Sequence, residues 1–87
     1  MKKYAVYSGS TGRLGSVTIG EDVVVSAGGK TARFPPRYAE SVILGKTLPL
    51  GKVEVKLSYY DLLGSKSEFD FAMSEGDARA LKHLLGK

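Results

Sequence analysis

Alternation of apolar and polar residues in the second half of the chain constrains its fold more than any other feature. Residues 53–60 alternate in this way, and residues 68–73 repeat the pattern. A period of two is typical of a strand with one buried and one solvated face. The short connection at residues 61–66 joins the two segments into a hairpin. We therefore predict a mainly β fold with antiparallel strands.

The apolar residues of this hairpin also predict its register. The expected pairs are Tyr59 with Phe69, Leu57 with Phe71, and Val55 with Met73. This register places all three apolar pairs on one face, which a hydrophobic core selects. On the other face Lys56 would lie diagonal to Asp70, as a modest ion pair on a solvated surface.

The rest of the chain predicts shorter strands separated by turns. The expected strands are residues 3–7, 16–19, 23–26, 31–34 and 41–44. Gly9, Gly12 and Gly15 fall in a Ser/Thr-rich stretch, 8–15, that predicts a flexible loop. A phosphate loop would instead end in Lys-Ser/Thr and lead into a helix. Pro36 can open a single helical turn, and residues 45–51 indicate a loop.

The C-terminal segment predicts one helix over about residues 75–85. Ser74 is a suitable N-cap, and Gly86 supplies a C-terminal stop. One face of this helix is apolar and carries Ala78, Leu81, Leu84 and Leu85. A helix of about 11 residues is marginal in isolation, so this face must dock on the sheet.

The expected core combines the buried faces of these elements. It comprises Val17, Ile19, Val23, Val25, Phe34, Val42, Leu44, Val55, Leu57, Tyr59, Phe69, Phe71, Leu81 and Leu85.

Length and cysteine content limit what such a chain can do. Its 87 residues suit one domain, 1–87, which buries only roughly 60–65% of its unfolded surface and leaves little room for an elaborate active site. Cysteine is absent, which excludes disulfides and thiolate metal ligands and fits a reducing, intracellular setting.

The apolar runs are far shorter than the ~20 residues of a membrane helix, and no signal-peptide core follows Met1-Lys2-Lys3. We expect a cytoplasmic protein.

Four segments carry a resemblance to a known superfamily. Residues 34–45 contain an apolar-Pro step before a Ser-Val strand, and residues 53–64 contain a Tyr-x-Asp-x-x-Gly hairpin. Residues 69–71 form a Phe-x-Phe strand, and residues 74–81 include the helix pattern Asp-Ala-x-x-Leu. In these features the chain resembles the pleckstrin-homology-like superfamily, in its GRAM-type and bacterial versions. The resemblance implies a partly open β-barrel capped at one end by the helix, and use as a protein-interaction or membrane-surface adaptor. Phosphoinositide binding is not implied, because the first loop offers only Arg13 where such members carry paired basic residues.

The net charge of +4 arises in the strand-rich part of the chain. Residues 1–60 contain nine Lys/Arg and four Asp/Glu, whereas residues 61–87 contain four and five. The candidate surface for an anionic ligand or nucleic acid consists of Lys2, Lys3, Arg13, Lys30, Arg33, Arg37 and Tyr38. Small barrels bind single strands by pairing phosphates with basic side chains and stacking bases on aromatic rings. The alternative interpretation is a set of scattered, solvated side chains.

The sequence contains no recognisable catalytic machinery. His83 is the only histidine, and a triad or a metal site needs convergent partners. Asp61, Glu68 and Asp70 cluster around one hairpin, but with lysines nearby they indicate a solvated charged face rather than acid–base chemistry. We therefore predict that the protein is not an enzyme and has no cofactor and no metal ion.

These observations favour a non-catalytic interaction or adaptor module. A protein or peptide partner could add as a strand to an open sheet edge, and the same edges would permit self-association. The alternative is a small basic nucleic-acid-binding protein, and a membrane-surface role ranks behind both. A deep polar pocket around Asp61 and Asp70 would instead favour an enzyme.

Overall fold

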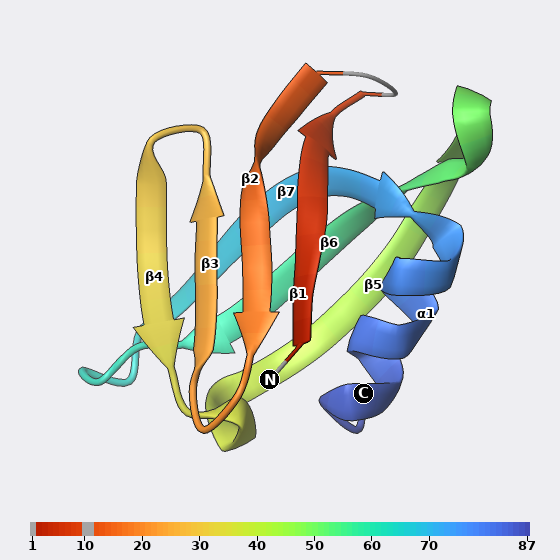
Figure 1. Ribbon diagram of the computed structural model, residues 1–87. Helices are drawn as coiled ribbons and strands as arrows, with labels where there is room; N and C mark the ends of the chain where they lie inside the picture. The colour runs from red at the N-terminus through yellow and green to blue at the C-terminus, as the bar shows by residue number, and fades with distance from the viewer. Residues whose placement is uncertain (1, 10–11) are drawn as a thin grey trace.

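A computed structural model describes residues 2–9 and 12–87 of the chain (Figure 1). The elements are β1 (Lys2–Ser8), β2 (Gly12–Ile19), β3 (Val23–Ala27), β4 (Lys30–Phe34), the 3-10 turn η1 (Pro36–Tyr38), β5 (Ala39–Leu48), the 3-10 turn η2 (Pro49–Gly51), β6 (Lys52–Tyr60), β7 (Lys66–Ser74) and α1 (Glu75–Leu84). The mainly β fold with one C-terminal helix is confirmed. No helix in these residues has both the length and the apolar character needed to cross a membrane.

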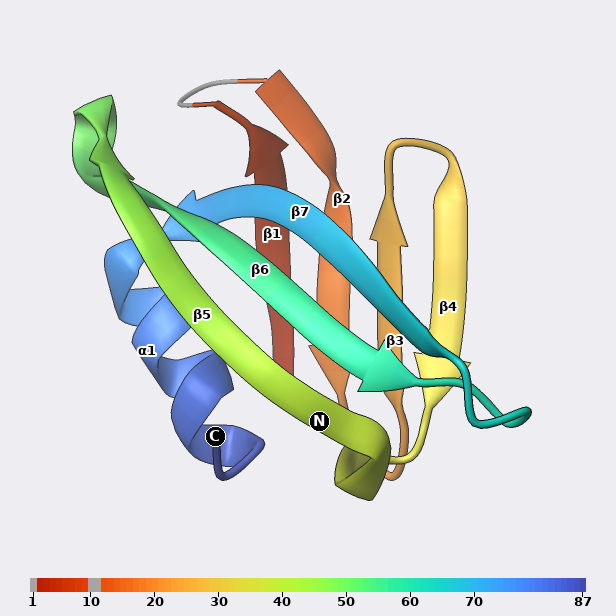
Figure 2. The ribbon, with the colours of Figure 1, turned by 180° about the vertical axis from the view of Figure 1, so that it is seen from behind.

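The described strands form one antiparallel sheet in the order β4-β3-β2-β1-β7-β6-β5. A single residue pair, Tyr7 with Ala72, joins β1 to β7. The sheet therefore folds over at this junction, and β1–β4 lie across β5–β7 as two leaves (Figures 1 and 2). We call β1–β4 the first leaf and β5–β7 the second leaf. Because β4 and β5 do not pair with each other, the barrel stays partly open, as predicted.

The core fills the space between the two leaves and extends under α1. In the first leaf Val17, Val23 and Val25 are fully buried, and Val17 of β2 lies opposite Val25 of β3. The rings of Phe34 and Tyr59 stack at 4.4 Å between centroids, which joins the end of β4 to β6. Of the residues predicted for the core, two are only partly buried, Ile19 and Leu44, and both still pack against it.

The helix begins and ends where the sequence predicts. The Ser74 hydroxyl accepts a hydrogen bond from the Asp77 amide at 3.3 Å, and Gly86 takes a φ of 70°. Ala78 and Leu81 are fully buried against the sheet. The prediction that Leu84 shares this buried face is wrong, because the residue is 45% exposed.

The predicted register of the β6–β7 hairpin is wrong by two residues. The observed pairs are Val53 with Met73, Val55 with Phe71, Leu57 with Phe69, and Tyr59 with Ser67, and Lys56 lies directly opposite Asp70. A shift of two keeps every apolar side chain on the same face, so alternation alone does not separate the two registers.

The turn at the tip of this hairpin accounts for the difference. The Asp61 carboxylate accepts hydrogen bonds from the amides of Leu63 and Ser65, each at 2.9 Å, and the Asp61 amide donates to the Ser65 carbonyl. These bonds close the loop between Asp61 and Ser65, so pairing resumes at once with Tyr60 opposite Lys66. Local turn chemistry therefore sets the register.

The largest differences from the predicted strand limits are in β2 and β5. β2 begins at Gly12 rather than at residue 16, so the predicted loop over 8–15 is wrong for Gly12 and Gly15; Ser10 and Thr11 lie outside the described residues. A Cβ atom on Gly15 would overlap the carbonyl oxygen of Ser26, so glycine permits the close approach of β3. β5 runs from Ala39 to Leu48, past the predicted end at residue 44, with irregular pairing near its C-terminal end.

Candidate functional site

β5 presents an unpaired edge of the sheet. It pairs with β6 on one side and, among the described residues, with no strand on the other. The Val42 carbonyl accepts a hydrogen bond at 2.9 Å from Nζ of Lys82, which lies on α1, so this carbonyl points away from β6. Residues along an antiparallel strand alternate in the direction of their backbone groups, so the amide and carbonyl of Leu44 also face this open edge.

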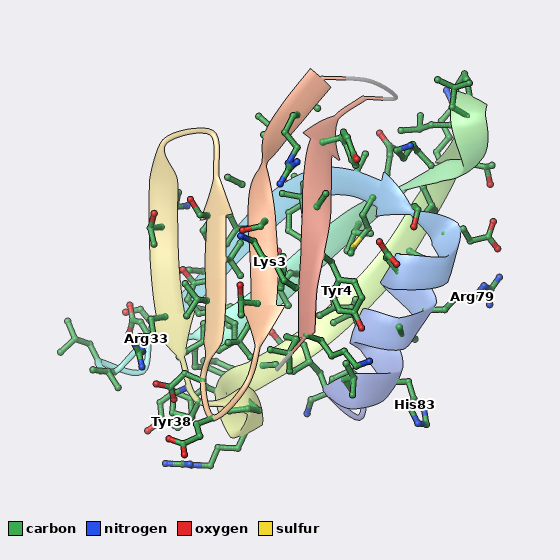
Figure 3. The ribbon with its side chains drawn as sticks, in the orientation of Figure 1. Lys3, Tyr4, Arg33, Tyr38, Arg79 and His83 are labelled. Atoms are coloured by element: carbon green, nitrogen blue, oxygen red, sulfur yellow. The ribbon has the colours of Figure 1, made fainter. Side chains whose placement is uncertain are left out.

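The helix α1 forms the opposite wall of a groove along this edge. Ala78 and Leu81 hold the helix on the sheet, which leaves its basic side chains toward β5 and solvent. Figure 3 shows Arg79 and His83 extending from α1 away from the first leaf. Arg79 is paired with Glu75 one turn earlier, at 2.8 Å from Nη2 to Oε2, and its side chain stays 71% exposed.

The groove between β5 and α1 has a volume of about 650 Å³. Its described lining residues are Val42, Ile43, Leu44, Arg79, Lys82, His83, Gly86 and Lys87. Because three consecutive residues of one strand line it, and their side chains alternate between the two faces, the groove follows the backbone edge itself. Val42 is fully buried and Ile43 is 54% exposed. The arrangement offers backbone hydrogen-bonding groups, an apolar side chain and positive charge along one line.

A second groove, of about 540 Å³, lies against the outer face of the second leaf. Tyr7, Leu14 and Ile43 give it apolar walls, and Lys56 and Asp70 lie in it directly opposite each other. Within the described part of the chain, no three His, Asp or Glu side chains gather as a metal site. This groove is therefore a hollow in which charges of one sign do not concentrate.

The predicted acidic cluster does not converge on one point. Asp61 is engaged in its own turn, Asp70 lies beside Lys56, and Glu68 lies 3.4 Å from the hydroxyl of Ser58. These carboxylates therefore occupy separate places along the hairpin. His83 is exposed and belongs to the β5–α1 groove.

The predicted basic residues are spread over the molecule. Lys3 and Arg33 lie on the outer face of the first leaf, in one row that passes through Thr18 and Val24 (Figure 3). Three strand spacings of about 4.8 Å place them about 14 Å apart. The Nε of Arg33 also lies 2.8 Å from the carboxylate of Asp22, which neutralises it in part.

The other members lie at further separate points. Lys2 is exposed at the start of β1, and Arg13 near the start of β2 donates to the Gly15 carbonyl at 2.9 Å. The ammonium group of Lys30 lies 4.8 Å from the centre of the Phe69 ring.

Arg37 and Tyr38 are the predicted pair that the structure brings together. The guanidinium of Arg37 lies 5.2 Å from the centre of the Tyr38 ring, and Tyr38 itself packs against the core. The ring is therefore partly buried, with a cation already beside it.

Sequence reasoning missed the β5–α1 groove because its candidate surface for an anionic ligand drew only on the first 38 positions, and His83 was considered only for a triad or a metal site. One signal was available. Residues 42–44 are three consecutive apolar residues, which breaks the alternation expected of a strand with one wet face. The middle residue of such a run faces solvent, and in a strand at the edge of a sheet this marks a surface that a partner could cover.

No protein-family model matches this chain, and no match was found among curated proteins or among solved structures.

Proposed function

We propose that this protein is a non-catalytic interaction module that binds an extended peptide segment of a partner protein as an additional strand beside β5. The observation that carries the proposal is the hydrogen bond from Lys82 to the Val42 carbonyl. A backbone carbonyl of a long edge strand is bonded there to a side chain rather than to another strand. An incoming strand could take over that acceptor and the open groups of Leu44.

The residues that line the groove support this mode of binding. Peptides added to a sheet edge gain affinity from backbone hydrogen bonds and specificity from pockets for alternate side chains. The groove beside β5 supplies the backbone edge, the exposed Ile43 side chain on one face and the wall of α1 on the other. The same edge could accept β5 of a second copy, so self-association belongs to the same proposal.

We also propose kinship with the pleckstrin-homology-like superfamily. Seven described strands followed by one helix, in a sheet that stays partly open, agree with what the sequence resemblance implies. A cytoplasmic setting is part of this proposal, since a chain without cysteine needs no oxidising compartment to fold.

The proposal can be tested by selecting ligands from a library of displayed random peptides about 12 residues long, with the full chain as bait. We expect selected peptides to shift the backbone NMR signals of residues 42–44 and of α1. Ile43→Asp should weaken binding by about tenfold or more, because it places a charge where an apolar contact is made. Thr31→Asp, an exposed substitution on the other edge strand β4, is the matched control and should leave binding unchanged.

Two outcomes would contradict the proposal. One is selection of no peptide, or of peptides whose NMR shifts lie away from β5. The other is tight binding of labelled oligonucleotides with a steep dependence on salt, which would favour the nucleic-acid alternative because counterion release sets that slope.

A further inference from the structure

We propose that the segment bound beside β5 is acidic, and that Lys82 acts as a latch. When the segment binds, the ammonium group of Lys82 moves from the Val42 carbonyl to a carboxylate of the partner. This inference rests on the proposed function and adds the chemistry of the ligand. It starts from the charge of the groove, whose described lining includes Arg79, Lys82 and Lys87 but no Asp or Glu. Of these three, Arg79 is paired with Glu75, which leaves Lys82 and Lys87 as the main positive charges. Such a wall attracts a segment of opposite charge and repels a basic one.

The position of Lys82 goes beyond what the helix alone requires. Basic side chains in the last turn of a helix are favoured by its dipole, which accounts for Lys82 and His83 as residue types. The dipole does not account for the reach of Lys82 to a carbonyl 40 residues earlier in the chain. Its side chain is half-buried, and among the described residues its ammonium forms no ion pair.

An ammonium group bonded to a neutral carbonyl gains more from a carboxylate. Its bond to the Val42 carbonyl already has a charged donor, and a carboxylate would add the attraction between two opposite charges. A partner strand that carries Asp or Glu on the side of α1 would draw Lys82 away from Val42 and free that carbonyl for its own amide. A partner without a carboxylate would have to displace Lys82 and leave its charge poorly compensated.

Lys82 therefore favours acidic partners by attracting their carboxylates, and it disfavours other partners because its displaced charge is poorly compensated. Specific interfaces commonly combine both effects. Without a partner, Lys82 covers an acceptor that would otherwise invite pairing between copies of the chain. Side chains of the bound strand alternate between its two faces. The partner should therefore present an acidic residue toward α1 and an apolar residue next to Ile43, which identifies it as an extended segment that alternates acidic with apolar residues.

The test uses the full chain and three capped peptides of about eight residues, in which Val alternates with Glu, Gln or Lys. NMR titration of the chain locates each peptide and gives its affinity. We expect the Glu peptide to bind at least about tenfold more tightly than the Gln peptide, and the Lys peptide to bind least. This preference should shrink as salt is raised, because the groove is open to solvent.

The variant Lys82→Met tests whether the preference for the Glu peptide depends on Lys82 itself or on the summed positive charge of the groove. It keeps the apolar stem and removes the ammonium, so the Gln peptide should bind more tightly than to the wild type while the preference for Glu falls to about twofold. Lys87→Met is the matched control, since it removes one charge of the same groove without touching Val42, and it should keep most of the preference.

The outcomes distinguish this inference from the function on which it rests. Equal binding of the Glu and Gln peptides at residues 42–44 would overturn the acidic ligand and leave strand addition standing. Equal loss of preference in Lys82→Met and Lys87→Met would overturn the latch. Failure of every peptide to shift residues 42–44 would overturn both proposals.

Discussion

The two open edges of the sheet, β4 and β5, are protected by different means. β4 has five residues, two of them the exposed Lys30 and Arg33. β5 has ten residues, and the exposed Ile43 lies at its centre. A short, charged edge deters pairing with another chain, whereas a long edge with exposed apolar residues invites it.

On β5 the deterrent comes from another element. The helix α1 lies along the strand, and Lys82 covers the Val42 carbonyl. Protection by shortness and charge is a permanent property of β4, but protection by one side chain can be displaced. The same sheet therefore has one closed edge and one edge that can be opened, and the proposed peptide binding uses the second.

The largest expected effects come from truncating buried side chains at the two edges, and the first of these substitutions loosens α1. Leu81→Ala should lower the free energy of unfolding by about 2–5 kcal/mol, because a fully buried side chain leaves a cavity. It should also cause association that increases with protein concentration, since the helix no longer covers β5. Urea unfolding and analytical ultracentrifugation measure the two effects.

Phe34→Ala is the matched variant at the end of β4. Phe34 is buried, and its loss should cost about 3–5 kcal/mol. Because β4 stays short and charged, this variant should remain monomeric at concentrations where Leu81→Ala associates. If both variants associate equally, general instability rather than the β5 edge is responsible.

A smaller difference in stability is expected between alanine substitutions of two glycines. Gly15→Ala should destabilise the protein by about 1–3 kcal/mol, because the new methyl group meets the Ser26 carbonyl between β2 and β3. In β5, a Cβ on Gly45 would lie 3.6 Å from the Cβ of Glu54, an ordinary contact, so Gly45→Ala should stabilise by about 0.4–1 kcal/mol. Thermal unfolding of both variants checks this, and a loss of stability in Gly45→Ala would mean that β5 is as closely packed as β2.

The sequence predicted the elements of this fold better than their limits. Alternation located β6 and β7, and the N-cap Ser74 and the stop Gly86 located α1, because each of these signals is local. The register of the hairpin was not predictable from alternation, since a shift of two residues preserves it. It depends on the turn built around Asp61.

The candidate site depended on contacts between distant parts of the chain. Lys82 and Val42 lie 40 residues apart, and no pattern in the sequence joins them. The role of Gly15 likewise depends on the approach of Ser26, which only the packing of β2 against β3 reveals. The basic residues of the first half were recognisable as charges, but whether they share a surface is a property of the folded sheet.

The ion pair beside β4 should have a modest effect. Arg33 lies 2.8 Å from Asp22, and its side chain is 72% exposed. Asp22→Asn should therefore cost about 0.2–1 kcal/mol, and the cost should fall as salt approaches about 1 M. Peptide binding at the β5–α1 groove should not change in this variant. A weaker peptide affinity would show that the two edges are coupled.

The smallest effect is expected at the start of β5, where Glu40 is tied to Lys66 of β7 at 2.8 Å between Oε2 and Nζ. The hydrogen bond and the negative charge of Glu40 raise the pKa of Lys66 above its ordinary value. A raised pKa in the folded state means that the pair stabilises the protein fully below the pKa of an unfolded lysine. This contribution disappears as the pH rises through the folded value.

Urea unfolding of the wild type, Lys66→Met, Glu40→Gln and the double variant, at about pH 8 and again above about pH 11, measures this contribution. We expect a small coupling between the two residues at the lower pH and none at the higher pH. Because the side chains of Lys66 and Glu40 are 47% and 32% exposed, the coupling should also decrease with salt. A coupling that persists when Lys66 is deprotonated would mean that the pair anchors β5 through packing rather than charge. In that case, the start of this edge would be held as permanently as β4.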